Sequence, residues 1–172
     1  MEMKLTWIQQ KREDSLDIFE GDKEIGYIGS IDDLRETTSA IFGKQLLFRD
    51  LGWLKRTTHI IDVATNRIIG EINYSPMAKR ATVTINGYVS KWNHPLFGLS
   101  WMLTNPSGLR IQYKTEYKTE ECSGRITSNK RDALQLIVGL YIEQYRLRIE
   151  NRIALIVGII ALPATIATIL LR

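Results

Sequence analysis

The sequence predicts a mainly β fold, a closed antiparallel β-barrel of about 10–12 strands around a hydrophobic helix, followed by a C-terminal transmembrane helix. Three observations lead to this prediction. Apolar and polar residues alternate through much of residues 2–127, and residues 133–142 place apolar side chains on every face of a helix. Residues 153–171 hold no charge.

The strands are predicted from a period of two. Residues 81–86 alternate aliphatic side chains with threonine and asparagine, and residues 99–104 and 109–114 repeat this pattern. Asn86-Gly87 is the clearest hairpin signal, because both central positions of its turn need a positive φ. So many short strands exceed a small open sheet, which leaves a closed barrel or a sandwich. Residues 31–43 break the alternation, and we predict a loop or a short helix there.

A buried helix is predicted to follow the strands, over residues 132–145. Asp132 is well placed as its N-cap. The apolar run after it is too short to span a bilayer and has charged flanks, so it belongs inside the protein. Glu143 and Arg146 are expected where the helix returns to water. We therefore predict one domain over residues 1–145, with this helix filling the interior of the barrel.

The C-terminal segment 153–171 is predicted to be a transmembrane tail anchor. It is uncharged over 19 positions, and as a helix it would be about 28 Å long, close to the hydrocarbon thickness of a bilayer. A helix buried in a soluble core is the alternative. Residues 146–152 form a basic juxtamembrane linker with three arginines, whereas only Arg172 follows the span. Because basic residues stay on the cytoplasmic side, the N-terminal domain is expected in the cytoplasm.

Charge is distributed unevenly along the chain. Residues 1–37 carry 5 basic and 10 acidic groups, and residues 38–172 carry 18 basic and 9 acidic groups. A basic excess beside a membrane span is attracted to anionic lipid, at about 1 kcal/mol per residue near the surface. Solvated sheet faces, or arginines that only set topology, are the alternatives. The candidates for contact with lipid headgroups are the basic residues that flank the two apolar segments, Arg146, Arg148, Arg152, Lys130 and Arg131.

The sequence holds no recognisable catalytic or metal-binding motif. His59 and His94 lie in no nucleophile or zinc pattern, and Cys122 has no base near it in sequence. The acidic run at residues 13–24 lacks oxygen ligands at the positions that a calcium loop requires. The four tryptophans are more typical of a barrel core than of base stacking. We therefore predict no catalytic residue, no metal, no cofactor and no nucleic acid partner, and the lone cysteine favours a reducing compartment.

The order of these elements resembles the tubby-like superfamily, which includes the tubby C-terminal domain, the phospholipid scramblases and the LURP-one-related proteins. The resemblance is carried by residues 60–72, by Ser123-Gly124-Arg125-Ile126, and by Asp132 with the apolar helix after it. It implies a closed barrel of about twelve strands around a helix, over residues 2–145. The chain lacks the Pro-rich segment, the Cys-rich acylation run and the acidic calcium segment of animal scramblases, so the resemblance does not imply calcium-dependent scrambling.

We expect a non-enzymatic, membrane-anchored module that binds anionic lipid headgroups or a partner protein at the cytoplasmic membrane face. One alternative is a scramblase-like protein that moves phospholipids between leaflets, and another is an enzyme whose site is assembled from distant residues. The first function predicts a basic surface patch, the second an open barrel, and the third a cleft that holds perturbed titratable groups.

Overall fold

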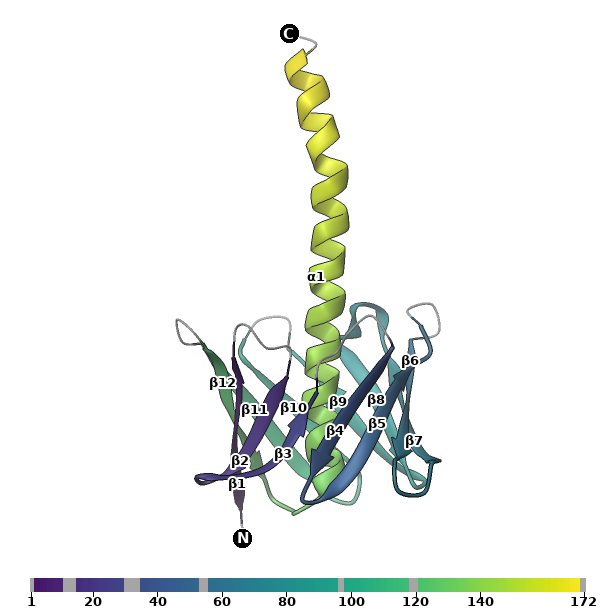
Figure 1. Ribbon diagram of the computed structural model, residues 1–172, viewed down its shortest axis with the longest axis vertical. Coiled ribbons are helices and arrows are strands. Elements are labelled where there is room, and N and C mark those ends of the chain that lie inside the picture. The colour runs from purple at the N-terminus through teal and green to yellow at the C-terminus, as the bar shows by residue number, and fades with distance from the viewer. Residues whose placement is uncertain are drawn as a thin grey trace.

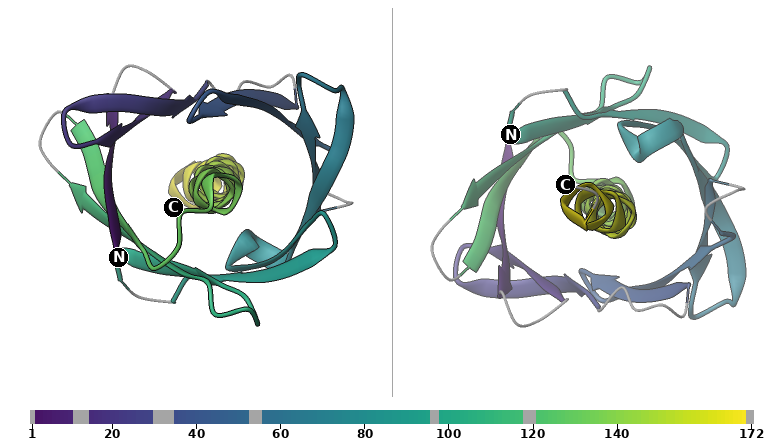
Figure 2. Two further views of the ribbon diagram at one scale, coloured as in Figure 1. Left: turned by 90° about the horizontal axis from the view of Figure 1, so that it is seen from below. Right: turned by 90° about the horizontal axis from the view of Figure 1, so that it is seen from above.

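The computed structural model describes residues 2–10, 15–29, 35–52, 56–95, 98–117 and 121–170, without the side chains of residues 10, 117, 121, 152 and 155–170. Within this part of the chain, twelve strands close into an antiparallel barrel around one helix, α1 (Figures 1 and 2). The mainly β fold and the closed antiparallel barrel are therefore confirmed. The elements are β1 (Met3–Gln10), β2 (Leu16–Glu20), β3 (Lys23–Ile28), β4 (Glu36–Ile41), β5 (Lys44–Asp50), β6 (Thr57–Asp62), β7 (Arg67–Tyr74), η1 (Pro76–Ala78), β8 (Arg80–Ile85), β9 (Tyr88–Asn93), β10 (Ser100–Thr104), β11 (Arg110–Tyr117), β12 (Glu121–Ser128) and α1 (Ala133–Leu170).

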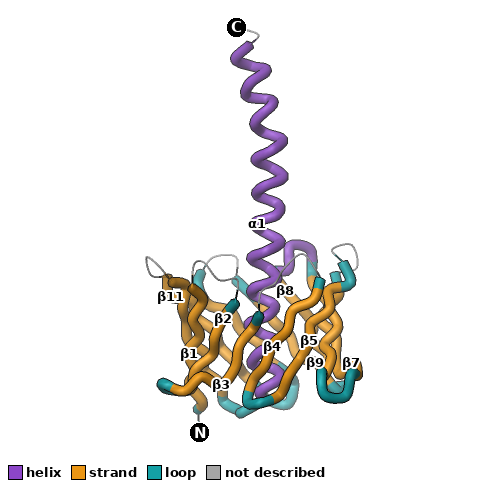
Figure 3. Tube along the Cα trace, viewed as in Figure 1, coloured by secondary structure: helices purple, strands orange, loops and turns teal. Residues whose placement is uncertain are grey.

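Each strand pairs with its neighbours along the chain, and β1 pairs with β12 to close the barrel. Short turns join the strands at both ends of the barrel (Figure 3). The Asn86-Gly87 turn joins β8 to β9 as predicted, with φ of 48° and 82° at its two residues. This meander leaves no open sheet edge, because every strand has two partners.

The prediction of a loop or short helix over residues 31–43 is wrong for its second half, because β4 occupies residues 36–41. Its first part, residues 31–34, lies outside the described residues. The inward-facing positions of β4 are Thr37, Ser39 and Ile41. Two of these three are small hydroxyl residues, so the strand carries little of the hydrophobic alternation on which the prediction depended.

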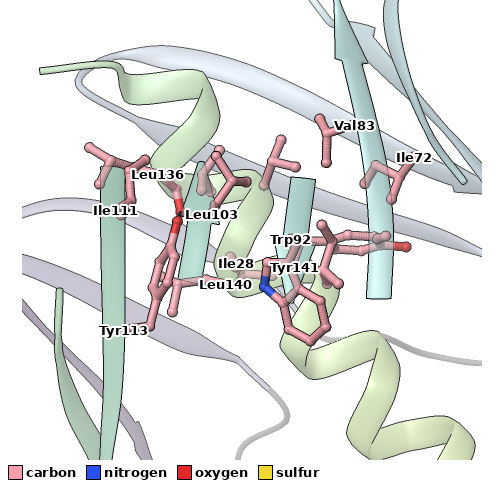
Figure 4. Packing of buried hydrophobic residues seen from close by; sticks show 14 of the residues in the cluster. Ile28, Ile72, Val83, Trp92, Leu103, Ile111, Tyr113, Leu136, Leu140 and Tyr141 are labelled. Atoms are coloured by element: carbon pink, nitrogen blue, oxygen red, sulfur yellow. Dashed lines mark hydrogen bonds between the residues drawn. The ribbon is translucent and has the colours of Figure 1, made fainter. Parts of the chain in front are cut away.

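Helix α1 fills the interior of the barrel (Figure 2). Residues 135–142 of α1 are all buried, and their large hydrophobic side chains are at most 1% exposed. These side chains pack against the inward side chains of the strands (Figure 4). Two hydrogen-bonding side chains of the barrel reach the helix backbone. Trp92 Nε1 donates to the carbonyl of Gly139 at 3.2 Å, and Tyr113 Oη lies 3.0 Å from the carbonyl of Leu136. The predicted burial of this segment is therefore confirmed.

Gly139 allows the close approach of α1 to the barrel wall. A Cβ at this position would clash with the phenol ring of Tyr113. A glycine inside a helix costs about 1 kcal/mol relative to alanine, and here the missing side chain makes room for an aromatic ring at full packing density.

Helix α1 continues without a break after it leaves the barrel, and its outer part projects away from the strands (Figure 1). Residues 146–152, predicted as a linker between two helices, are part of this single helix. Glu143 and Arg146 were expected to reach water, but they are only 6% and 8% exposed, so the helix returns to solvent later than predicted.

The predicted anchor falls largely on side chains that the structure does not describe. Within the described residues, we find no helix whose length and apolar character would let it cross a membrane. The side chains of residues 155–170 and all of residues 171–172 lie outside that part of the chain. The anchor at 153–171 stays a prediction.

Candidate functional site

A cluster of charged side chains occupies the end of the barrel from which α1 emerges. We call it the mouth cluster and define it as His94, Glu143, Arg146 and Glu150. The last three lie on one face of α1, at spacings of three and four residues, and His94 follows the end of β9. Together with Lys79, these side chains line a polar cavity of ≈ 210 Å³.

Arg146 is held by two carboxylates. Its Nε donates to Glu143 Oε2 at 2.9 Å and its Nη2 to Glu143 Oε1 at 2.6 Å, while its Nη1 lies 2.6 Å from Glu150 Oε2. The hydrogen bonds with Glu143 raise the pKa of Arg146, against the opposing effect of burial. The guanidinium is therefore always charged, and the two-pronged geometry compensates part of the cost of removing both ions from water.

His94 completes the cluster from the barrel side. Its Nδ1 lies 2.6 Å from the carbonyl oxygen of Pro95. Because a carbonyl only accepts, Nδ1 carries the proton of this hydrogen bond. The other ring nitrogen, Nε2, faces Glu143 Oε1 at 3.9 Å, and the His94 side chain is 10% exposed. That separation is too long for a direct hydrogen bond.

Cys122 on β12 lies near this cluster and is half buried. Burial raises the pKa of the Cys122 thiol, and the negative charge of Glu143 raises it further. Because the thiolate is the reactive form of cysteine, this environment keeps Cys122 in its unreactive thiol form at neutral pH. The ion pairs of the cluster thus join charged side chains within α1, and His94 of the barrel lies beside them.

The opposite face of α1 is bound to the barrel by aromatic stacking. Phe48 stacks on Tyr141 with ring centroids 3.9 Å apart, and Tyr74 stacks on Tyr145 at 4.1 Å. The guanidinium of Arg148 lies over the Tyr145 ring, 5.4 Å from its centroid. The two faces together fix both the depth and the rotation of the helix in the barrel.

The structure separates the five predicted lipid-headgroup candidates. Arg146 is buried and paired, so it is not open to headgroups. Arg148 is partly buried beside Tyr145, and its Nη2 is buried without a hydrogen-bond partner within the described residues. The side chain of Arg152 lies outside the described residues. Lys130 donates to the carbonyl of Ser107 at 2.6 Å, and Arg131 pairs with a carboxylate at 3.0 Å.

Lys130 and Arg131 also lie at the wrong end of the barrel to act with the other candidates. They precede the start of α1, whereas Arg146 lies more than a dozen residues further along it. At about 1.5 Å per residue, the two groups are separated by about 20 Å along the helix. The expectation that Lys130 and Arg131 assist the arginines after the core helix is therefore corrected.

Sequence reasoning missed the mouth cluster. The spacing of Glu143, Arg146 and Glu150 was a usable signal, because it places three charges on one helix face. Nothing in the sequence placed His94 against them, since that contact joins residues 49 positions apart.

Comparison of the chain with protein-family models, with curated proteins and with solved structures finds no match.

Proposed function

We propose that this protein is a non-enzymatic module that the C-terminal part of α1 holds at the cytoplasmic face of a membrane. The observation that carries the proposal is the continuity of α1: one helix contains the core segment of the barrel and the uncharged run from Ile153 onward. A barrel attached in this way has its mouth next to the bilayer, where the helix emerges.

The residues between the barrel core and the uncharged run fit an interface with a membrane. Arg148 lies in this stretch with its guanidinium 5.4 Å from the centroid of the Tyr145 ring, and Arg152 follows one turn later. Long basic side chains reach headgroups while their stems stay along apolar surface. Of the five candidates, these two arginines are the ones that we retain for contact with anionic lipid.

We favour a module that is held at the membrane over one that moves lipid between leaflets. Lipid transport through a barrel needs an open interior, and the described core side chains of α1, such as Leu136, Leu140 and Ile142, are at most 1% exposed. The tubby-like relationship remains part of the proposal, and the order of strands and central helix supports it.

Truncation after Arg152 tests the anchor. This end point keeps Glu150, which pairs with Arg146, and Ile149, which packs against the core. We expect the full chain to sediment with membranes and to require detergent, and the truncated chain to be soluble with unchanged β-rich circular dichroism. As a control, an unrelated uncharged helix of equal length should restore membrane association. A truncated chain that still sediments with membranes, or a full chain that is soluble without detergent, would contradict the proposal.

The lipid contact is tested separately with the soluble truncated chain. Binding to anionic vesicles should exceed binding to neutral vesicles and should weaken as salt is raised, because surface attraction decays over about 8 Å at physiological ionic strength. Replacement of Arg148 by glutamine should reduce this binding. Equal binding to both kinds of vesicle would remove the headgroup contact but leave the anchor intact.

A further inference from the structure

The outer surface of the barrel has a basic side. Five exposed cations point outward from β8, β9, β11 and β1, and we call the surface that they form the outer basic face. Its members are Lys4, Arg80, Lys91, Arg110 and Lys114.

Strand register places these cations close together. Lys91 is opposite Thr82 on β8, so Arg80, two residues from Thr82, is its diagonal neighbour at about 7–8 Å. Lys91 and Arg110 both pair with Thr104 of the strand between them. At about 4.8 Å per strand, these two cations are about 10 Å apart.

The charges of the outer basic face form no ion pair with the carboxylates that the structure describes. Within the described part of the chain, none of its five cations has a carboxylate within ion-pair distance. Lys114 even lies opposite a second cation, Arg125, and like charges placed opposite each other destabilise a sheet. Of these two cations, Arg125 has a carboxylate partner among the described residues, Glu116 at 2.6 Å, and Lys114 has none.

Cations elsewhere on the barrel are of both kinds: within the described residues Lys23 and Arg67 have no carboxylate at ion-pair distance, whereas three others are paired. Lys44 lies 3.3 Å from Asp62, Arg49 lies 2.6 Å from a carboxylate of β4, and Arg131 lies 3.0 Å from Glu20. What distinguishes the outer basic face is that several such cations lie on neighbouring strands, which gives this side of the barrel a local positive potential that favours a negatively charged partner.

Two adjoining depressions lie on this face and share Arg80 and Asn93 in their walls. One has a volume of ≈ 390 Å³ and includes Gln112, and the other has a volume of ≈ 480 Å³ and includes Asn73 and Lys91. The Asn73 amide already accepts from Thr57 and donates to Glu71, which leaves the amides of Asn93 and Gln112 to offer a donor and an acceptor. Such groups match the alternating N–H and C=O groups of an extended peptide, and the cations match carboxylates on its side chains.

We propose that the outer basic face is a docking site for an extended, acidic protein segment of a partner. Nucleic acid fits less well, because the aromatic residues in the walls of the two depressions, Tyr74 and Trp101, are only 7% and 2% exposed and offer no open ring for base stacking. A lipid surface is disfavoured by orientation: the face runs along the side of the barrel, and under the proposed function that side is turned away from the bilayer. This last argument alone rests on the proposed function.

The test uses the full chain in a neutral detergent, so that no membrane is needed. The probe is a labelled peptide of alternating glutamate and asparagine, about 10 residues long, which at about 3.4 Å per residue crosses the face. We expect saturable binding in fluorescence anisotropy, weakened by salt, and at least about ten-fold weaker binding to the double variant Arg80→Gln/Lys91→Gln.

The control variant Lys23→Gln/Arg67→Gln removes the same charge from exposed positions elsewhere on the barrel and should bind the peptide as the unmodified chain does. Circular dichroism checks that both variants are folded. Equal weakening in the two variants would reduce the effect to net charge and overturn the proposal. So would tighter binding of a single-stranded oligonucleotide or of a soluble phosphorylated lipid headgroup than of the peptide, or competition by a second copy of the chain. Loss of the anchor in the truncation experiment would leave this outcome unaffected.

Discussion

Arg146 carries a permanent positive charge into the end of the barrel core, and Glu143 makes its burial tolerable. Both side chains are under 10% exposed, and two hydrogen bonds join them. A buried ion pair of this kind adds little net stability compared with an apolar pair, but removal of Glu143 leaves the buried Arg146 with only the more exposed Glu150 as a partner.

We therefore expect Glu143→Gln to destabilise the protein by about 2 kcal/mol, because the buried Arg146 guanidinium loses its two-pronged partner and keeps only Glu150. Chemical denaturation of the full chain in detergent, followed by circular dichroism, measures the loss. Glu150→Gln is the matched control, since Glu150 contacts the same guanidinium from a side chain that is 36% exposed, and it should cost less than about 1 kcal/mol. Equal losses in the two variants would show that burial of the pair is not what matters.

At the scale of the element, the contact between α1 and the barrel wall depends on tyrosines that are buried in their neutral form. Burial raises the pKa of Tyr141 to about 12 and raises those of Tyr74 and Tyr113 well above the usual value. Tyr74 also donates to Thr58 Oγ1 at 3.1 Å, which satisfies its hydroxyl inside the core.

This burial predicts loss of stability at alkaline pH. Because the folded-state pKa of Tyr141 lies above the unfolded-state value of about 10, its contribution is complete below pH 10 and disappears as pH rises toward 12. Tyr141 alone should then lose about 1.4 kcal/mol by pH 11. Denaturation at pH 7 and pH 11 should show a smaller difference for Tyr141→Phe than for the unmodified chain. Phe48→Leu disturbs the same stack without removing a titratable group, so its cost should be equal at the two pH values.

How far an element could be predicted depended on which residues carry its pattern. The burial of residues 135–142 followed from a run with no polar face, and the β8–β9 hairpin followed from Asn86-Gly87. Strand β4 was not predicted because two of its side chains that face the barrel interior are hydroxyl residues rather than apolar ones. That residues 146–152 continue the helix was not predicted, because their charged side chains were expected to lie in solvent. Arg146 is instead buried and paired with Glu143.

At the scale of the whole molecule, the barrel is closed by the first strand pairing with the last. Eight residue pairs join β1 to β12, and the inward side chains of β1, Leu5 and Trp7, are each 2% exposed. Closure was predictable from the number of short strands. The mouth cluster was not, because it exists only after β9 and α1 have come together.

Deletion of residues 2–10 should therefore unfold or aggregate the protein, because it removes two large core side chains and exposes the edges of β2 and β12. Size-exclusion chromatography in detergent together with circular dichroism measures the outcome. The double variant Glu2→Ala/Thr6→Ala, which changes two exposed side chains of the same segment, should remain folded. A deleted chain that stays monomeric and β-rich would mean that the remaining strands can close without β1.

Because α1 is continuous, the number of its residues between the barrel and the segment beyond residue 153 sets how the barrel is rotated relative to that segment. A helix turns by about 100° and advances about 1.5 Å per residue. One residue inserted after Asn151 would rotate the barrel by more than a quarter of a circle about the helix axis, relative to the outer part of α1. Seven inserted residues would return the barrel to within about 20° of its original orientation and move it about 10 Å further from that part. The direction in which the outer basic face points about the helix axis, relative to the segment beyond residue 153, is thus set by the number of residues in the helix between them.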